Sequence, residues 1–357
     1  MRRLLETLAS SKPVVLVFDD LHWAEPVLID LIETLAARCR DAPVLLLCPA
    51  RPELLERHPR FGAAQDDHLS IRLEPLGADD STRLVQALLG RASLPAETHA
   101  RVTEFAGGNP LFIEELLGTL IDDELIRQEN GGWVTTGDLS QIAIPPTLEA
   151  LLASRLDRLG SDQRVTIECA SVEGQVFHQD AVRALSPIDG GVEVPAALTA
   201  LSNKQFIRSA AASVAGDVAF RFRHILIRDA AYRGVAKRTR ADLHEQFAEW
   251  LENMAGARIP EYEEVIGYHL EQAYRYRAEL GPIDETARAR ARRAAEHLGG
   301  AGRRALLTRG DMPAAVNLLE RACSLVPEED PFRRRLQIDL GAALVQAGEL
   351  QRAGEVF

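Results

Sequence analysis

A short apolar run that ends in two acidic residues decides the fold: Val14-Val15-Leu16-Val17-Phe18-Asp19-Asp20. A continuous apolar run rich in valine predicts a strand buried on both faces of a sheet. Apolar side chains recur at helical spacing over residues 26–39, and residues 44–48 form a second apolar run. Strand, helix and strand with short joints make a βαβ unit, so we predict a parallel sheet with Ile71 to Leu76 as its third strand.

The chain becomes helical in pattern after this sheet. Three features are expected next: a helix over 81–89 capped by Asp79 or Asp80, a helix from Pro110 to about Ile126, and a small turn or hairpin at 131–134. Pro145-Pro146 then marks a domain boundary. Beyond it, helices near 148–159, 162–172, 178–185 and 195–203 precede two strand-like pieces at 206–209 and 218–222, followed by helices at 224–236 and 238–254. Three helices and a two-stranded wing are the winged-helix pattern.

The last hundred residues are helical and repeat weakly. Gly310-Asp311 recurs as Gly348-Glu349, and Ala305 and Ala315 recur as Ala343 and Ala353, all at an offset of 38 residues. Small residues at fixed places allow paired helices to pack closely, as in tetratricopeptide-like arrays. We expect few contacts across residues 252–263, which contain Gly256 and Pro260, so that this array is separable.

Composition excludes several classes of protein. The chain has 357 residues and a net charge of −12, which argues against broad, non-specific nucleic-acid binding. Its four cysteines are scattered, without metal-ligand spacing or a disulfide framework. No run approaches 18 apolar residues, and the basic start has no cleavage site, so we expect a cytoplasmic protein without a membrane partner.

Asp19 and Asp20 have the chemistry of a magnesium and water-activating pair. Nucleotides bind at the carboxyl edge of open α/β sheets, where a strand holds such carboxylates rigidly. Asp19 would hold Mg²⁺, which prefers oxygen ligands, and Asp20 would orient or deprotonate the attacking water. The alternative is that the two acids cap a strand and solvate a turn.

The residues that follow each strand suggest a family. The first strand continues as Leu21-His22-Trp23-Ala24-Glu25, and the second is followed by Arg51. This pattern resembles STAND-class P-loop ATPases, in particular those fused to nucleotide cyclase domains or acting as large transcriptional regulators. Their Walker B strand is followed by His-Trp-Ala-Asp, and Glu25 stands here in place of the last Asp. The resemblance implies ATP and Mg²⁺ as cofactors, with Arg51 sensing the γ-phosphate.

Two further nucleotide contacts follow from the same resemblance. Gly107-Gly108-Asn109-Pro110 matches the turn that opens the lid helix near the adenine, and the alternative is a simple helix break. His224 matches the histidine that contacts the ADP β-phosphate, although Ile225 replaces the aspartate of that element. The alternative for this segment is a core-facing helix with a solvated basic side.

The phosphate-binding loop is absent from this sequence. A Walker A loop needs Lys followed by Ser or Thr, but Lys12, Lys204 and Lys237 are followed by Pro, Gln and Arg. We therefore expect that Met1 is not the natural start and that the chain, by itself, is inactive. The sequence does not decide whether the complete protein hydrolyses ATP or carries a fused nucleotide cyclase domain.

The predicted fold class is α/β followed by all-α, in four parts. These parts are half of a P-loop ATPase core with a partial parallel sheet (1–77), a helical lid (78–144), a winged-helix-like module (145–255) and incomplete tetratricopeptide-like repeats (256–357). We expect an ATP-binding switch of a multidomain signalling or transcriptional regulator, whose helical repeats receive a protein partner or inducer. The alternatives are a nucleotide-independent adaptor and a winged-helix DNA binder, which the acidic balance disfavours.

Overall fold

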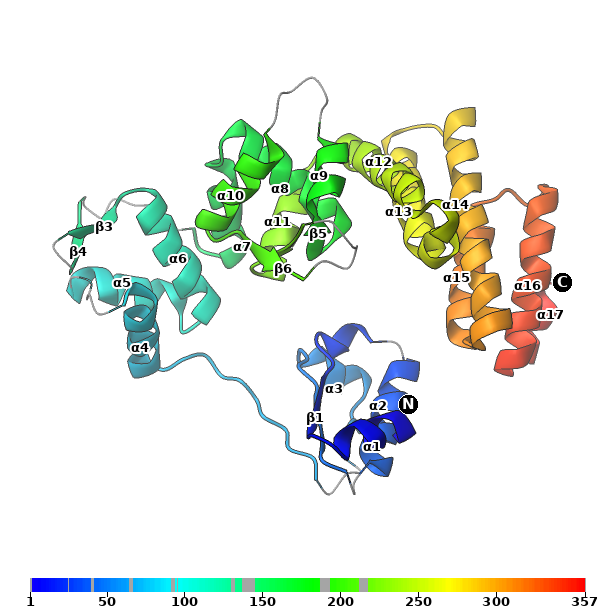
Figure 1. Cartoon of the computed structure of the whole chain (residues 1–357), viewed down its shortest axis with the longest axis horizontal. Coiled ribbons are helices and arrows are strands. Elements are labelled where there is room, and N and C mark those ends of the chain that lie inside the picture. Colours follow the sequence, from blue (N-terminus) through cyan, green and yellow to red (C-terminus); the bar gives the residue numbers. More distant parts are fainter. Residues whose placement is uncertain are drawn as a thin grey trace. The chain divides into compact units, whose positions relative to one another are not determined.

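A computed structural model describes residues 2–24, 26–39, 42–63, 67–90, 94, 96–129, 132–136, 145–186, 193–211 and 218–356. These residues are mostly helical, with a few small sheets (Figure 1). None of the helices in this described part is both long enough and apolar enough to cross a membrane. The chain divides into two compact units, Met1–Glu74 and Pro75–Phe357, and each has hydrophobic cores of its own.

The first unit contains the predicted βαβ arrangement. Its elements are α1 (Arg2–Ala9), β1 (Val14–Val17), the 3-10 helix η1 (Leu21–Trp23), α2 (Pro26–Arg38), β2 (Val44–Leu47) and α3 (Glu53–Arg57). The strands β1 and β2 run parallel, with Val14 opposite Val44 and Val17 opposite Leu47. The prediction of a parallel pair joined by a helix is confirmed.

The sheet is covered on one face only, which the sequence pattern did not predict. Leu16 and Leu46 pack against buried side chains of the helices. Alternate residues on the other face are exposed: Val15 by 57%, Val17 by 57% and Leu45 by 58%. The expectation of strands buried on both faces is therefore wrong for the described residues, because successive side chains of a strand point to opposite faces and only one face has helices against it.

The predicted third strand, Ile71 to Leu76, does not form. The sheet contains only β1 and β2 within the described residues, and no strand pairs with the segment. Leu69, Ile71 and Leu73 are exposed by 78%, 71% and 90%. A strand needs a neighbouring strand for its backbone N–H and C=O groups, and no strand in the described part of the chain pairs with this segment.

The second unit begins with three helices and a hairpin. They are α4 (Ala78–Leu89), α5 (Ala96–Ala106), α6 (Pro110–Asp122), β3 (Ile126–Glu129) and β4 (Gly132–Thr135). The antiparallel pair β3 and β4 confirms the predicted hairpin. Helix α4 starts earlier than predicted, after Gly77, so Asp79 and Asp80 lie in its first turn and do not cap it. Helix α6 ends earlier than predicted, because Glu124 adopts a left-handed φ of 55° and Ile126 begins a strand.

A helical module with a three-stranded sheet follows. Its elements are α7 (Leu148–Asp157), α8 (Ser161–Glu173), β5 (Val176–His178), α9 (Gln179–Leu185), α10 (Val194–Asn203), β6 (Ile207–Ala210), β7 (Ala219–Phe222) and α11 (Ile225–Gly234). The predicted helices and the two predicted strands are confirmed. The sheet order is β5-β7-β6, all antiparallel. Strand β5 was not predicted, because three residues are too few to show a period.

One buried arginine fastens this module to the helix before it. Arg155 of α7 pairs with Glu115 of α6 and donates to Asp122 Oδ2 at 3.0 Å and to the Lys204 carbonyl at 3.1 Å. Arg155 and Glu115 are both nearly inaccessible to solvent. The burial raises the pKa of Glu115, and the Arg155 guanidinium opposes that shift. The boundary predicted at Pro145 is therefore bridged by a desolvated ion pair.

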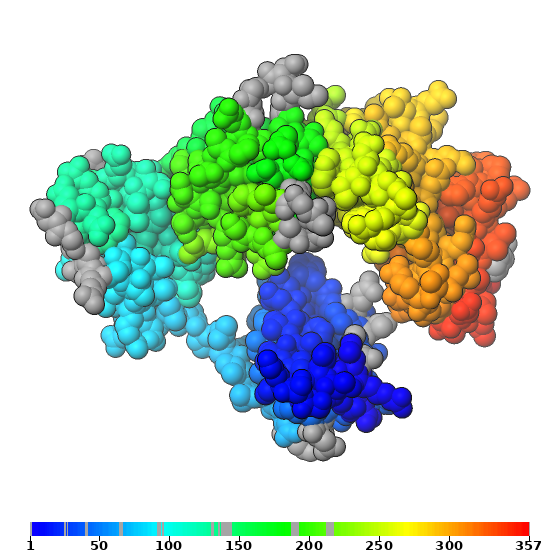
Figure 2. Space-filling view, in the orientation of Figure 1, coloured from blue at the N-terminus to red at the C-terminus, as the bar shows by residue number. Residues whose placement is uncertain are grey.

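The last helices form a single body with this module. They are α12 (Lys237–Ala255), α13 (Ile259–Leu280), α14 (Glu285–Arg304), α15 (Met312–Ser324), α16 (Pro331–Ala347) and α17 (Leu350–Val356), with the 3-10 helix η4 (Gly256–Arg258) and the π-helix η5 (Ala305–Arg309). One hydrophobic core runs from Leu152 to Ala353. The surface is correspondingly continuous from the green helices to the yellow ones (Figure 2).

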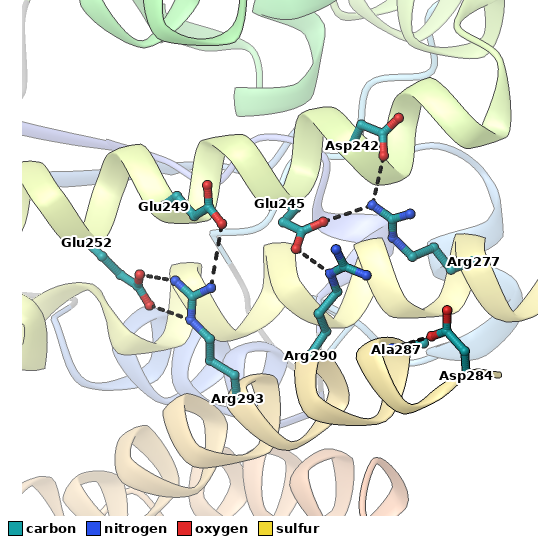
Figure 3. Close-up of polar contacts among 9 residues, drawn as sticks. All are labelled: Asp242, Glu245, Glu249, Glu252, Arg277, Asp284, Ala287, Arg290 and Arg293. Carbon is teal, nitrogen blue, oxygen red and sulfur yellow. Dashed lines mark hydrogen bonds and ion pairs between the residues drawn. The ribbon is translucent and has the colours of Figure 1, made fainter.

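A ladder of ion pairs crosses the predicted separable joint. Acids of α12 face arginines of α13 and α14 (Figure 3). Arg277 donates to Asp242 at 2.7 Å and to Glu245 at 2.8 Å, and Arg293 pairs with Glu252. The expectation of few contacts across residues 252–263 does not hold, because α12 packs against α13 and forms ion pairs with α14.

The residues related by the offset of 38 occupy similar places. Gly310 and Gly348 each end a helical segment in the left-handed region, at φ 65° and 82°. Ala305 and Ala343 are fully buried. The small residues therefore lie at close helix contacts; at Gly302, for example, an added Cβ would come within 2.8 Å of Leu319.

Candidate active site

The two predicted catalytic acids lie directly after β1, at its carboxyl end. Phe18 continues the pairing, since its N–H donates to the Leu47 carbonyl at 2.9 Å. Asp19 and Asp20 are both exposed. Asp20 has a left-handed φ of 52°, and its N–H donates to Asp19 Oδ1 at 3.0 Å. One oxygen of Asp19 therefore stabilises the turn, and the rest of both carboxylates faces solvent.

Arg51 reaches the same edge from the neighbouring strand. The turn after β1 is tied to the turn after β2, since the Leu21 N–H donates to the Pro49 carbonyl at 3.1 Å. Arg51 is exposed. In the described part of the chain it makes no ion pair with Asp19 or Asp20. Because parallel strands end at one edge, the structure brings these three predicted site residues to that edge as two carboxylates and one cation.

The carboxylates at this edge can hold Mg²⁺ only if ligands from outside the protein complete its coordination. No group of three or more His, Cys, Asp or Glu side chains suited to a metal occurs among the described residues. Magnesium binds proteins through one or two carboxylates and takes its other ligands from water and substrate phosphates. Asp19 and Asp20 meet that need for carboxylates, and the remaining ligands would have to come from a bound nucleotide and water.

His22 also lies at this edge, and the sequence pattern gave it no functional role. Its ring is 6% exposed, and neither ring nitrogen has a hydrogen-bond partner within the described residues. Nδ1 lies 3.9 Å from Asp20 Oδ1. The next residue, Trp23, is 72% exposed. Burial of an unsatisfied imidazole is costly, and a small rotation of Asp20 would supply the missing partner.

Pro110 opens α6 as predicted, but the turn before it contacts the chain itself. Asn109 caps the helix by accepting hydrogen bonds from the N–H groups of Leu111 and Phe112. Gly108 has φ 77°, and an added Cβ would lie 2.5 Å from the Leu76 carbonyl oxygen. The Leu76 N–H also donates to the Gly108 carbonyl at 2.8 Å. The close approach that this glycine permits is therefore to the backbone of Leu76.

His224 precedes α11 and caps it. Its Nδ1 accepts a long hydrogen bond, 3.4 Å, from the Leu226 N–H. The preceding Arg223 pairs with Glu114 of α6 and with Gln205. Pro110 and His224 both belong to the second unit, whereas Asp19, Asp20 and Arg51 belong to the first. The structure thus groups the predicted site residues into two sets.

A buried polar chain joins α11, α12 and α13. Tyr232 Oη lies 2.7 Å from His244 Nε2 and 2.9 Å from Tyr276 Oη, and His244 Nδ1 lies 2.8 Å from His269 Nδ1. Burial lowers the pKa of His244 to about 3, with the guanidiniums of Arg228 and Arg240 adding to the shift. His269 is 2% exposed and therefore lies in the packed interior between helices.

Comparison with known proteins gives two similarities. Residues 77–133 match a family model described as Domain of unknown function (DUF8739). Over 252 residues, the chain is 29% identical to Uncharacterized protein R02095 of Rhizobium meliloti (strain 1021); the match covers 68% of this chain and 23% of that protein. The chain therefore spans about a quarter of the length of this relative. The DUF8739 match covers α4 to the start of β4 and includes the turn at Gly108 and Pro110.

Proposed function

We propose that this chain is the ATP-responsive switch part of a multidomain regulator of the STAND type. The observation that carries the proposal is the edge formed by β1 and β2, where Asp19, Asp20 and Arg51 follow neighbouring parallel strands. The carboxylates would hold Mg²⁺ and the attacking water, and the guanidinium would contact the γ-phosphate. The exposure of all three side chains leaves them accessible to a nucleotide.

In this proposal, the helical parts of the chain respond to the nucleotide state and bind a partner. The sheet β5-β7-β6 with α8 to α11 supports a winged-helix-like module, and the buried small residues at an offset of 38 support tetratricopeptide-like packing of α13 to α17. In this proposal, nucleotide state alters the relation of the first unit to the second, and a partner or inducer binds the helical array.

The 357-residue chain alone should not bind ATP usefully. Triphosphate affinity depends on backbone N–H groups of a glycine-rich loop and its lysine, and no Lys here precedes Ser or Thr. One exposed cation such as Arg51 contributes at most about 1 kcal/mol, against about 8 kcal/mol for a micromolar site. Calorimetric titration of Mg·ATP into this chain is expected to give no saturable heat.

The decisive test uses the longest product of the gene. Asp20→Asn should lower ATP turnover by roughly 10²–10⁴-fold with nucleotide binding retained. Arg51→Ala should reduce the preference for ATP over ADP. Asp80→Asn, which changes an exposed acid on α4, is the matched control and should change neither. If Asp20→Asn hydrolyses ATP at the wild-type rate, Asp20 has no catalytic role and only follows the strand.

A nucleotide-independent adaptor is the second candidate, favoured by the missing phosphate loop. It predicts that the longest gene product neither binds nor hydrolyses ATP, while partner binding by the helical array persists. If that product neither binds nor hydrolyses ATP, the second proposal replaces the first.

A further inference from the structure

A cavity of about 640 Å³ opens on the helical array. Ile283, from the connection between α13 and α14, lines one side, and Leu325, Val326 and Pro327, from the connection between α15 and α16, line another. Leu325 and Val326 are buried members of the main core. The cavity thus has an apolar wall held rigidly by the fold, and its volume lies in the range typical of sites for small ligands.

Four of the charged side chains in the lining form two ion pairs, Arg292 with Asp330 and Arg333 with Glu328, although Arg333 Nε has no hydrogen-bond partner within the described residues. Arg292 donates to Asp330 Oδ2 at 2.6 Å, and Asp330 also accepts the Phe332 N–H at 2.8 Å. Arg333 donates to the Val326 carbonyl at 2.8 Å and lies 3.6 Å from Glu328. These arginines and acids are committed to holding the loop between α15 and α16.

Glu285 and Arg288 are the remaining charged residues of the lining. Both lie in the first turn of α14, three residues apart, and both are exposed. Within the described residues, neither side chain takes part in an ion pair or hydrogen bond. The rim of an apolar cavity therefore carries one unpaired carboxylate and one unpaired guanidinium. A simple anion would face Glu285, and a simple cation would face Arg288.

We propose that this cavity binds a short zwitterionic peptide with an apolar side chain. Its ammonium group would pair with Glu285, its carboxylate with Arg288, and its side chain would lie against Leu325 and Val326. Side chains three residues apart on a helix have Cβ atoms about 5–6 Å apart, and an extended dipeptide spans at most about 7 Å. The match in length selects a dipeptide. The proposal concerns the helical array alone and does not rest on nucleotide binding.

Calorimetry with four forms of one dipeptide tests this assignment on the full chain. The probes are leucyl-phenylalanine, its N-acetyl form, its C-terminal amide and the doubly blocked form. We expect saturable binding of the free dipeptide, weakened up to about fivefold by each single block, since each removes one exposed charge pair. Equal binding of all four forms, or binding of none, would overturn the proposal.

Variants tie the charges to particular residues. Arg288→Gln should bind the free dipeptide and its amide equally, and Glu285→Gln should bind the free and N-acetyl forms equally. Ala289→Trp fills the lined space and should abolish binding, with thermal unfolding used to confirm that each variant is folded. Arg334→Gln, which changes an exposed arginine outside the lining, is the control and should bind as the wild type does. A full response to the blocked ends in Arg288→Gln would show that another cation holds the carboxylate.

Discussion

His244 and His269 are hydrogen-bonded to each other through their Nδ1 atoms, 2.8 Å apart, in the core between α12 and α13. One ring must donate and the other accept, so the two rings cannot both be imidazoliums while this contact holds. Tyr232 and Tyr276 extend the chain toward Arg240, whose guanidinium lies over both tyrosine rings. The contact therefore excludes two charged histidines, and burial disfavours the charged form of each ring.

The stability of the second unit should fall in mild acid because of this pair. Burial and nearby guanidiniums lower the pKa of His244 to about 3, and burial lowers that of His269 well below 6.5. Below pH 6.5 the two histidines become protonated in the unfolded chain, whereas they stay neutral in the native state. Their contribution to the free energy of unfolding is therefore complete above about pH 6.5 and declines toward pH 3. The slope is about 1.4 kcal/mol per pH unit for each histidine at most. Urea unfolding at pH 7 and pH 5, together with NMR of labelled histidine, measures this loss. An ordinary titration midpoint near pH 6.5 for either ring would contradict the assignment.

Arg155 should be among the most sensitive positions of the second unit. Arg155→Met leaves Glu115 buried without its partner, and we expect a loss of about 3–5 kcal/mol in the free energy of unfolding. The double variant Arg155→Met with Glu115→Leu should recover most of that loss, because no buried charge remains. Arg158→Met, which removes a more exposed pair with Asp123, should cost about 1 kcal/mol or less. A double variant as unstable as the single one would show that Arg155 acts through its other acceptors.

Gly108 and Gly90 offer a matched pair of glycine substitutions. Both have left-handed φ angles, 77° and 76°, but an added Cβ meets the Leu76 backbone only at Gly108. Gly90→Ala should cost about 1–3 kcal/mol from the backbone conformation alone, since φ 76° with ψ −149° is a region that glycine alone adopts readily. Gly108→Ala should cost about 1–3 kcal/mol more, since backbone must move. Equal losses in thermal or urea unfolding would mean that the turn at Leu76 yields without resistance.

Limited proteolysis should cut between the two units and spare the joint at residues 252–263. The segment around Leu69, Ile71 and Leu73 is exposed and unpaired with any strand, so trypsin is expected to cleave first after Arg72. The joint after α12 is protected by the ladder to Arg277 and Arg293. First cleavage at Arg258 would indicate that the ladder does not hold the array in solution.

Local sequence determined much of this protein. The apolar runs at β1 and β2, with a helical period between them, predicted a parallel pair, because strand and helix periods are read from neighbouring residues. The same reasoning located the helices from α7 to α12. The placing of Asp19, Asp20 and Arg51 at one edge follows from that topology, since parallel strands share their carboxyl edge. Their role with a nucleotide remains a prediction.

Contacts between residues far apart in the sequence decided the features that no local pattern could predict. Ile71 to Leu76 reads as a strand, but strand formation depends on a partner, and the described residues provide none. The stretch around Gly256 and Pro260 reads as a linker, yet Glu245 and Glu252 of α12 meet arginines 32 to 45 positions away. The cavity that leaves Glu285 and Arg288 unpaired arises only when two distant loops are placed side by side. Sequence spacing sets which side chains share a helix face, whereas packing between helices sets which charges are neutralised and which stay free.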